Sequence, residues 1–377
     1  MGAVRGILVM VMVGLTGAGR QAPSAAEVAG LPAVVQVGAI PFPAEAADAE
    51  GTAVRVGGIS GIAWLGDDGW IAVMDNSDRL LSFGLDLAVD GMPLAVRDLR
   101  ALRLSARHDY EDVAVCPPAV AARIARRWRT DGRADPRPFV FVCEEDTPAI
   151  RGVSLADGSL LGRVPLPPIL GSMRPNRGLE SLATDLQRRL LWTANEEALP
   201  EDGPPSTVGA GTVVRLVAIP LPADDGAAAE ADTADPPGTG SGVQLAYAVD
   251  PPHGFVQVMD RGTWSGVVAL VVLPGPAGGL LVLERSGAAG LPPFENRLYF
   301  VDPAAGVDVA GTTAGLAARV DRHVAKRLLW RAALGCNLEG LALGPELASG
   351  GRALVAVADD GGLDATGRIV VLRITSP

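Results

Sequence analysis

Short apolar runs separated by turn residues dominate the hydrophobic pattern of this 377-residue chain. Typical runs are AVVQVGAI near the start, FVFVC in the first half and GRIVVLRI near the end. Runs of this length, with little 3.6-residue periodicity, favour β-strands over helices. The 47 glycines and 30 prolines supply the turns that such strands require. The pattern therefore predicts an all-β protein.

One short motif recurs five times along the chain. In each copy an apolar residue is followed by Ser or Glu, then by a small or acidic residue, and then by two apolar residues. The copies are ISGIA, YEDVA, LESLA, WSGVV and LEGLA, which we call openers because each begins an apolar strand. The openers are spaced by 51, 69, 85 and 74 residues, counted between their second residues, which are Ser60, Glu111, Glu180, Ser265 and Glu339.

A second apolar strand follows each opener and ends in polar or charged residues, as in WIAVMDN, FVFVCEED, LLWTANEE, LLVLERS and ALVAVADD. A recurring unit of strand, turn, strand and acidic end fits the blades of a β-propeller, each of which needs about four strands. The early AVVQVGAI and the terminal GRIVVLRI could pair and close the ring. We therefore predict one β-propeller domain over residues 34–377, with six blades, or five as the alternative.

Two segments interrupt this pattern and are predicted to be loop insertions. Residues 222–242 have low complexity and few large apolar residues, which is typical of a surface loop. Residues 117–138 contain several arginines and are predicted to include a short basic helix with Trp128 packed inward. Such arginines more often form a solvated helix face than an anion site.

The first 26 residues have the pattern of an export signal. Arg5 precedes an apolar stretch over residues 7–15, and small residues follow up to Ala26. The apolar stretch is shorter than the roughly 20 residues of a membrane-spanning helix. We therefore expect residues 1–26 to be a signal peptide and the mature protein to be periplasmic or secreted, with no membrane segment. An uncleaved anchor is the alternative.

The three cysteines leave their redox state open. Cys116 and Cys143 each end an apolar run, so they could lie on neighbouring strands and form a disulfide in an oxidising compartment. Two buried thiols are an equal alternative. No metal-binding or nucleophilic pattern surrounds Cys336.

The net charge limits the partners of the chain. A formal charge of −11 at pH 7 argues against a nucleic-acid partner, because phosphate backbones need a basic face. The same acidity favours a small, weakly charged substrate over a highly phosphorylated one. Acidic clusters are better suited to cations.

The opener glutamates are candidate metal ligands. If the openers are the innermost strands of the blades, their second residues lie at one depth around the central channel. Carboxylates crowded there repel one another unless a cation, a basic group or protonation offsets their charge. Ca²⁺ accepts carboxylate oxygens in flexible geometry, so we predict a calcium site formed by Glu111, Glu180, Glu339 and Asp360. Hydrogen bonds from the glutamates to backbone at blade seams are the structural alternative.

Two arginines and one histidine are candidates to act beside this metal. Arg285 stands where the other second strands end in acid, and it could pair with channel carboxylates or bind an anionic substrate oxygen. Arg177 precedes the LESLA opener, and His108 precedes DYED, where it could be a general acid or base. The chain contains no Gly-x-Ser-x-Gly elbow, no phosphate-cradling glycine loop and no zinc-binding spacing.

The segments GGISGIAW, DYEDVAV, NRGLESLATD, LLVLERSG and NLEGLALGPEL, in this order, resemble a bacterial phytase-like family with esterase-like activity. The resemblance extends from about residue 34 to the C-terminus and implies an exported β-propeller related in architecture to the calcium-dependent alkaline phytases. The chain departs from the family pattern in YEDVAV and LES, where Glu-Gly is usual, and in ADDGG, where Ser-Asp-Asp-Asn is expected. By position, the family's functional residues correspond to Asn176, Arg177, Glu180, Glu284, Arg285, Glu339, Asp359 and Asp360.

These observations predict a monomeric, metal-assisted hydrolase of phosphate or carboxylic esters that acts on a small molecule. Ca²⁺ would position anionic substrate oxygens and polarise the reacting centre for attack by water, while Arg177 and Arg285 stabilise developing negative charge. A calcium-dependent lactonase on a similar propeller is one alternative. A non-catalytic propeller that binds a ligand or partner, with the glutamates serving the fold, is another.

Overall fold

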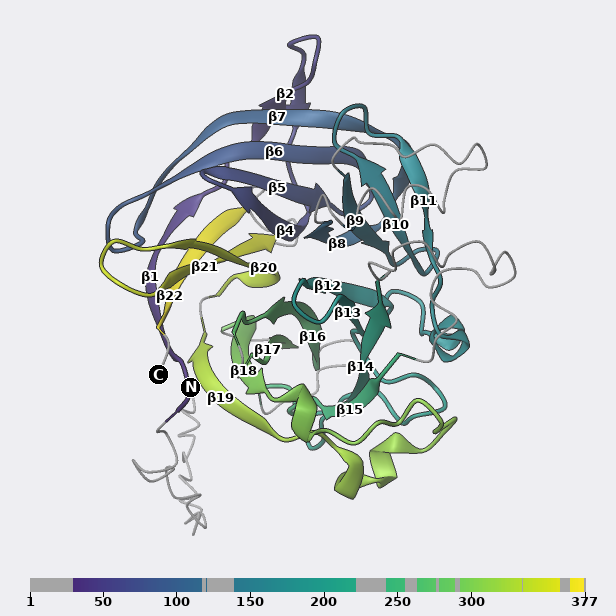
Figure 1. Cartoon of the computed structure of the whole chain (residues 1–377). Coiled ribbons are helices and arrows are strands. Elements are labelled where there is room, and N and C mark those ends of the chain that lie inside the picture. The colour runs from purple at the N-terminus through teal and green to yellow at the C-terminus, as the bar shows by residue number, and fades with distance from the viewer. Residues whose placement is uncertain are drawn as a thin grey trace, which may run out of the picture.

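A computed structural model of the chain shows five sheets arranged around one axis, each with four antiparallel strands, which is a five-bladed β-propeller (Figure 1). This arrangement confirms the predicted all-β propeller. The structure describes residues 30–116, 120, 139–221, 242–254, 263–275, 278–288, 292–333, 335–359 and 367–375. The predicted signal peptide, and the predicted insertions apart from residues 120 and 242, lie outside these ranges.

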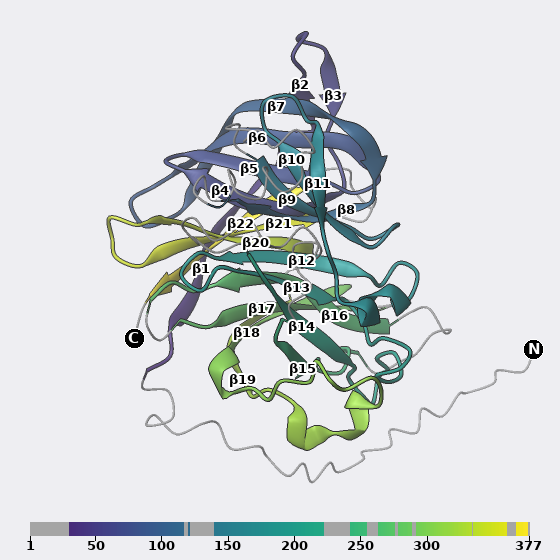
Figure 2. The ribbon, with the colours of Figure 1, turned by 45° about the vertical axis from the view of Figure 1, so that its right-hand side comes forward.

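From the axis outward, the first blade contains β4 (Ile59–Gly66), β5 (Gly69–Met74), β6 (Ser77–Leu87) and β7 (Pro93–His108). β2 (Glu45–Ala47) and β3 (Ala53–Arg55) extend this sheet beyond β7 as a hairpin, which Figure 2 shows projecting from the outer edge. The second blade contains β8 (Tyr110–Val115), β9 (Phe139–Glu144), β10 (Ala149–Ser154) and β11 (Leu160–Val164).

The third blade contains β12 (Leu179–Asp185), β13 (Leu190–Asn195), β14 (Val213–Pro220) and β15 (Gln244–Ala248). The fourth contains β16 (Thr263–Val272), β17 (Leu280–Ala288), β18 (Phe294–Val301) and β19 (Lys326–Ala332). The fifth contains β20 (Asn337–Glu346), β21 (Arg352–Asp359), β22 (Arg368–Thr375) and β1 (Ala33–Pro41). The short 3₁₀ helices are η1 (Pro168–Ser172), η2 (Pro303–Ala305), η3 (Leu316–Ala318) and η4 (Val320–Arg322).

The chain closes its ring within the fifth blade. β1 pairs antiparallel with β22, so that Ala33 lies opposite Thr375 and Pro41 opposite Arg368. The pairing predicted between the two terminal segments is therefore present. It supplies the outermost strand of the fifth blade instead of a separate closing blade, which is why the structure has five blades and not the six that we favoured from the sequence.

All five openers are innermost strands, because they begin β4, β8, β12, β16 and β20. Apolar side chains of neighbouring blades pack together at each seam of the ring. Between the first and fifth blades, for example, Ile59 and Trp70 pack in one cluster with Val355 and Val371. A sheet with two apolar faces is stable only when both are covered, and the closed ring covers both faces of every blade.

The cysteines are buried thiols, which resolves the open alternative for Cys116 and Cys143. Cys143 lies at the end of β9, where its thiol donates to the carbonyl oxygen of Asp112 at 3.8 Å. Burial raises the pKa of the Cys143 thiol well above its ordinary value.

Among the described residues, no helix has the length and apolar character needed to span a bilayer.

Candidate functional site at the acidic end of the channel

Strand direction brings the polar ends of the repeated units together. The first two strands of each blade are antiparallel, so the start of an opener lies beside the end of the second strand. Tyr110 pairs with Glu144, and Asn337 pairs with Asp359. Each acidic strand end, considered alone, indicated ordinary turn chemistry. The structure instead places these ends around one mouth of the channel, next to the opener glutamates.

A β-bulge sets the position of the opener's second residue in four of the five blades. Tyr110 pairs with Glu144 and Asp112 with Cys143, so Glu111 is the extra residue between two regular pairs. The same register shift occurs at the second residue of three other openers, namely Ser60, Glu180 and Glu339. A bulge removes its extra residue from the regular alternation and redirects its side chain. In the fourth blade the shift lies later, between Val267 and Ala269.

The opener serines and glutamates then differ in their hydrogen bonds. Ser60 donates its hydroxyl to the carbonyl oxygen of Tyr110, and Ser265 donates to that of Asp250. These contacts match the structural alternative, in which an opener joins neighbouring backbone. By contrast, neither Glu111 nor Glu180 forms a side-chain hydrogen bond or an ion pair with another residue in the described part of the chain.

Five carboxylates form two overlapping groups at this mouth. Oxygens of Glu145, Glu180 and Glu196 lie within 4.8 Å of one another, and so do oxygens of Asp109, Glu111 and Glu145. Glu180 is only 6% exposed and Glu111 is 9% exposed. Glu145 belongs to both groups and also accepts a hydrogen bond of 2.7 Å from the backbone nitrogen of Gly178. We call these five residues the acidic cluster.

Burial, together with neighbouring charges, raises the pKa of several carboxyl groups at the mouth. Burial, and then the charges of Glu111 and Glu196, raise the pKa of Glu180 well above its ordinary value. Burial raises the pKa of Glu145 to about 7, against a hydrogen bond from Gly178 that lowers it. Burial also raises the pKa of Glu339 to about 7. The mouth therefore favours bound protons or a bound cation over a full set of unpaired charges.

Two arginines lie against one side of the acidic cluster. Arg285 extends from the fourth blade, where one guanidinium nitrogen lies 3.0 Å from Glu196 Oε1 and another forms an ion pair with Glu339. Arg177 lies 2.9 Å from the second oxygen of Glu196. The ring of Trp264 lies below both guanidinium groups, with centroid distances of 4.6 Å to Arg285 and 5.1 Å to Arg177. Of the two roles left open for Arg285, the structure shows pairing with channel carboxylates.

The predicted metal ligands divide into separate environments. Glu111 and Glu180 belong to the acidic cluster. Glu339 instead accepts hydrogen bonds from Arg285 and from the amide nitrogen of Asn337. Asp360 lies outside the described residues, although the charge of its neighbour Asp359 contributes to the raised pKa of Glu339, after burial as the main cause.

The other predicted residues lie away from the cluster. The Nδ1 atom of His108 is 3.1 Å from Asp146 and 3.9 Å from Glu144, and these three form a group of their own. Glu284 faces the seam between the third and fourth blades, where it accepts a hydrogen bond of 2.7 Å from the hydroxyl of Tyr247 and pairs with Lys326. The structure therefore does not place His108 or Glu284 beside the acidic cluster.

Of the site residues Asp109, Glu145, Glu196 and Trp264, the sequence pattern favours ordinary turn chemistry over metal binding for Glu145 and Glu196 and does not single out the other two. A usable signal existed for two of them, because Glu145 and Glu196 each follow the second strand of a unit by one residue. Asp109 and Glu145 belong to the acidic cluster, whereas the adjacent His108 and Glu144 belong to the separate group with Asp146. Neighbouring residues of an extended chain point to opposite sides, which separates the two groups.

Asp112, the acidic third residue of its opener, has a structural role. Its buried carboxylate accepts backbone hydrogen bonds from Val113 at 2.8 Å and from Leu182 at 2.7 Å, and a third from Ile62. These bonds join β8 to β12 and β4 directly behind the acidic cluster. Burial nevertheless raises the pKa of Asp112 well above its ordinary value.

The fold and site define a five-bladed β-propeller whose channel has a carboxylate-rich mouth with two arginines. Residues 54–362 match the model of the Phytase-like family, described as "Esterase-like activity of phytase". The chain therefore belongs to this family.

Similarity to solved structures extends along most of the chain at low sequence identity. A PQQ-bound aldose sugar dehydrogenase from Streptomyces coelicolor has a TM-score of 0.37 and 11% identity, with coverage of 92% of this chain and 99% of that one. A streptogramin B lyase has a TM-score of 0.32 and 11% identity, with coverage of 85% and 94%. The WD40 domain of Toxoplasma gondii coronin has a TM-score of 0.30 and 11% identity, with coverage of 92% and 87%. The comparison with curated proteins gave no match.

Proposed function

We propose that this protein is an exported, metal-assisted hydrolase of phosphate or carboxylic esters, with Ca²⁺ held by Glu111, Glu180 and their neighbours in the acidic cluster. One observation carries the proposal: two carboxylates that are at least nine-tenths buried lack any hydrogen-bond or ion-pair partner among the described residues. A buried charge left in this state is strongly unfavourable. Membership of a family with esterase-like activity supports the reaction class.

The donor set suits calcium. The five ligand candidates offer only carboxylate oxygens, within 4.8 Å of one another in each group of three. Hard oxygen ligands in flexible geometry favour Ca²⁺, whereas zinc and copper sites are usually built with histidine or cysteine. A bound Ca²⁺ would supply charge neutralisation and polarisation of a substrate oxygen.

The two arginines would have different roles in the site. The side chain of Arg285 is 6% exposed and its guanidinium joins Glu196 to Glu339, so it fixes the wall of the site. The side chain of Arg177 is 33% exposed, and among the described residues its ion pair is with Glu196. Its remaining N–H groups would bind an anionic oxygen of the substrate and stabilise negative charge in the transition state. Water would be the attacking group.

The first test measures metal content and stability. Mass spectrometry of the purified mature protein would give its bound metal, and melting curves would be recorded with chelator and with added Ca²⁺. Binding to the native state alone stabilises it by about 2.7 kcal/mol at a free concentration 100 times Kd. Glu180→Gln, which keeps the side-chain shape, should lose most of this response. Glu50→Gln, at an exposed position of the β2–β3 turn, is the matched control.

Activity is then screened with aryl phosphates, aryl carboxylic esters and lactones in the presence and absence of Ca²⁺. We expect hydrolysis that falls by about tenfold or more in chelator and in Glu180→Gln. Turnover of lactones alone would identify the lactonase alternative. A protein with no bound metal, no calcium-dependent melting shift and no turnover would be a binding propeller, and the proposal would be rejected.

A further inference from the structure

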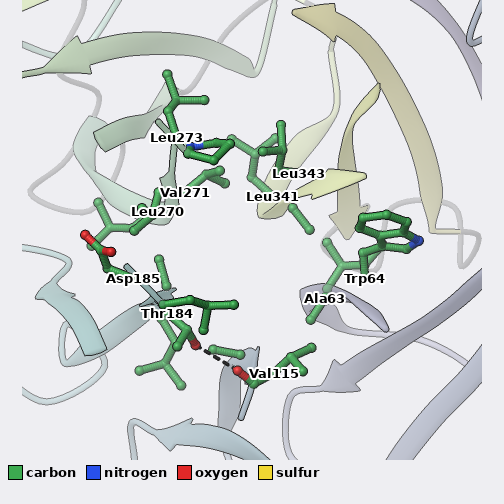
Figure 3. Close-up of a pocket in the computed structure, with 18 of the residues that line it drawn as sticks. Ala63, Trp64, Val115, Thr184, Asp185, Leu270, Val271, Leu273, Leu341 and Leu343 are labelled. Carbon is green, nitrogen blue, oxygen red and sulfur yellow. Dashed lines mark hydrogen bonds between the residues drawn. The ribbon is translucent and has the colours of Figure 1, made fainter. Parts of the chain in front are cut away.

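The opposite end of the channel contains a pocket that the proposed hydrolysis does not use. The second halves of all five innermost strands line it, and its volume is about 470 Å³. This volume is within the range of small-molecule sites. Figure 3 shows Trp64, Val115, Leu273 and Leu343 arranged around the open space. We call this cavity the apolar pocket.

The wall of the apolar pocket is built almost entirely from aliphatic side chains. β16 contributes Leu270 and Val271, and β20 contributes Leu341 and Leu343. Trp64 is the one aromatic residue among those that line it. Since successive residues of a strand advance by about 3.3 Å, three residues from each strand give the pocket a depth of roughly 10 Å.

Three of the four polar side chains that border the pocket, apart from the indole of Trp64, have partners within the protein, and Gln187 is the fourth. Thr184 donates its hydroxyl to the carbonyl oxygen of Val115 at 2.9 Å (Figure 3). Asp185 accepts hydrogen bonds from the backbone and the guanidinium of Arg188, at 2.8 and 3.0 Å. Arg352 donates to the carbonyl oxygen of Gly344 at 3.1 and 2.7 Å. The interior therefore offers apolar contact, while charged groups remain at the rim.

Innermost strands approach one another closely at a level between the apolar pocket and the acidic cluster. A Cβ atom on Gly61 would lie 2.5 Å from the Cα atom of Asp112 on β8, and one on Gly340 of β20 would lie 2.8 Å from Cα of Gly61. β4 thus approaches both of its neighbours at the level between the two ends. The residues that line the apolar pocket include none of the acidic cluster, so a ligand in the apolar pocket occupies a site of its own.

We propose that the apolar pocket binds the hydrocarbon chain of a single-chain amphiphile and leaves the polar head at the rim, near Asp185 and Arg352. A deep aliphatic wall fits a flexible chain, because each methylene that enters loses contact with water without needing a hydrogen bond. The rim carries one acidic and one basic side chain from the lining set, which suits an uncharged head such as a hydroxyl. This inference does not depend on the proposed hydrolysis.

The test is a chain-length series of linear alcohols, from n-butanol to n-decanol, measured by titration calorimetry with the full-length mature protein. Each added methylene that is buried should tighten binding by about fourfold, and the gain should stop once the chain fills the pocket. Saturation should occur at one alcohol per protein. Affinity that does not change with chain length would overturn the assignment.

Substitutions of residues in the pocket wall test where the alcohol binds. Ala63 lies in the wall of the pocket, so Ala63→Phe should occupy the space and reduce affinity for n-octanol by about tenfold or more. Leu343→Asn, at a half-buried position, should also weaken binding. This second variant keeps the test valid if Ala63→Phe does not fold. Leu94→Asn is the matched control, because Leu94 is 59% exposed on β7.

Three outcomes count against the proposal. Unchanged affinity in both pocket variants, each shown to be folded by its melting curve, would place the alcohol elsewhere. Equal weakening in Leu94→Asn would indicate a nonspecific effect. A dimer in sedimentation measurements that takes up no alcohol would show that a second copy covers the pocket.

Discussion

The two ends of the central channel are built from the same five strands and have opposite chemistry. At the acidic end, bulges turn Glu111, Glu180 and Glu339 out of the regular pairing. A few residues later β8 and β12 have regular register, as does β20 from Gly340 to Leu343, and all three contribute aliphatic side chains to the apolar pocket. An irregular residue near the start of the strand is thus enough to give a repeated scaffold a polar mouth, while regular alternation beyond it gives an apolar one.

The two ends also depend on different forces. At the apolar end, seam packing continues into the pocket wall, and loss of one side chain leaves its neighbours in place. At the acidic end, buried charges compensate one another, so that removal of a single partner leaves an uncompensated charge. We therefore expect equal-sized substitutions to have larger effects at the acidic end.

The largest effect is expected for Arg285→Met. This change removes the guanidinium that pairs with Glu196, whose side chain is 1% exposed, and with Glu339, whose side chain is 16% exposed. Breaking a buried ion pair by removing one partner usually lowers the free energy of unfolding by about 3–5 kcal/mol. Denaturant unfolding in chelator would measure the loss. Arg352→Met, at the rim of the apolar pocket, is the control and should lose about 1 kcal/mol or less. Similar losses in both variants would contradict the proposed difference between the ends.

The fold could be predicted from the sequence further than the site. Openers recur with a local pattern, so their assignment as equivalent strands needed only short-range information. Outer strands are less distinct: β19, for example, mixes half-buried and exposed positions without regular alternation. Their weak pattern explains why the sequence did not decide between five and six blades.

The site depends on register between segments that are distant in sequence. Glu196 approaches Arg285 across 89 residues, and Arg285 approaches Glu339 across 54. The pattern indicated that Glu180 and Glu339 were equivalent, yet one lacks a partner in the described part of the chain and the other is paired. The ion pair of Glu339 depends on Arg285 reaching it from the fourth blade, which no local pattern encodes.

The next effect is a pH dependence of stability in chelator. Burial raises the pKa of Glu145 from an ordinary value of 4.5 to about 7. Because the folded protein then holds this proton more tightly than the unfolded chain does, the resulting stabilisation is complete below about pH 4.5 and is lost as the pH rises through 7. A pKa shift of this size corresponds to about 3 kcal/mol at most.

Unfolding curves from pH 5 to 8 would measure this term as the difference between the wild type and Glu145→Gln, whose neutral amide can still accept the hydrogen bond from Gly178. The variant should have the shallower decline. Added Ca²⁺ should flatten the wild-type curve if the cluster holds the ion. Parallel curves for the two proteins in chelator would remove Glu145 from the set of buried, shifted carboxyls.

The smallest of the three effects tests the close strand contact at the level between the two ends. In Gly61→Ala the new Cβ atom would lie 2.5 Å from Cα of Asp112 and 2.9 Å from the carbonyl oxygen of Glu111, and these backbone atoms are held by strand pairing. Overpacking of this kind lowers stability by about 2 kcal/mol. Gly57→Ala is the matched control, because a Cβ atom there would meet no atom within 4 Å.

Since the new Cβ atom would push β4 away from β8, Gly61→Ala should also weaken both calcium binding and alcohol binding, whereas a variant at one end of the channel should weaken only one of them. If Gly61→Ala is as stable as the control, the strands can separate at this level and the two ends are not structurally distinct.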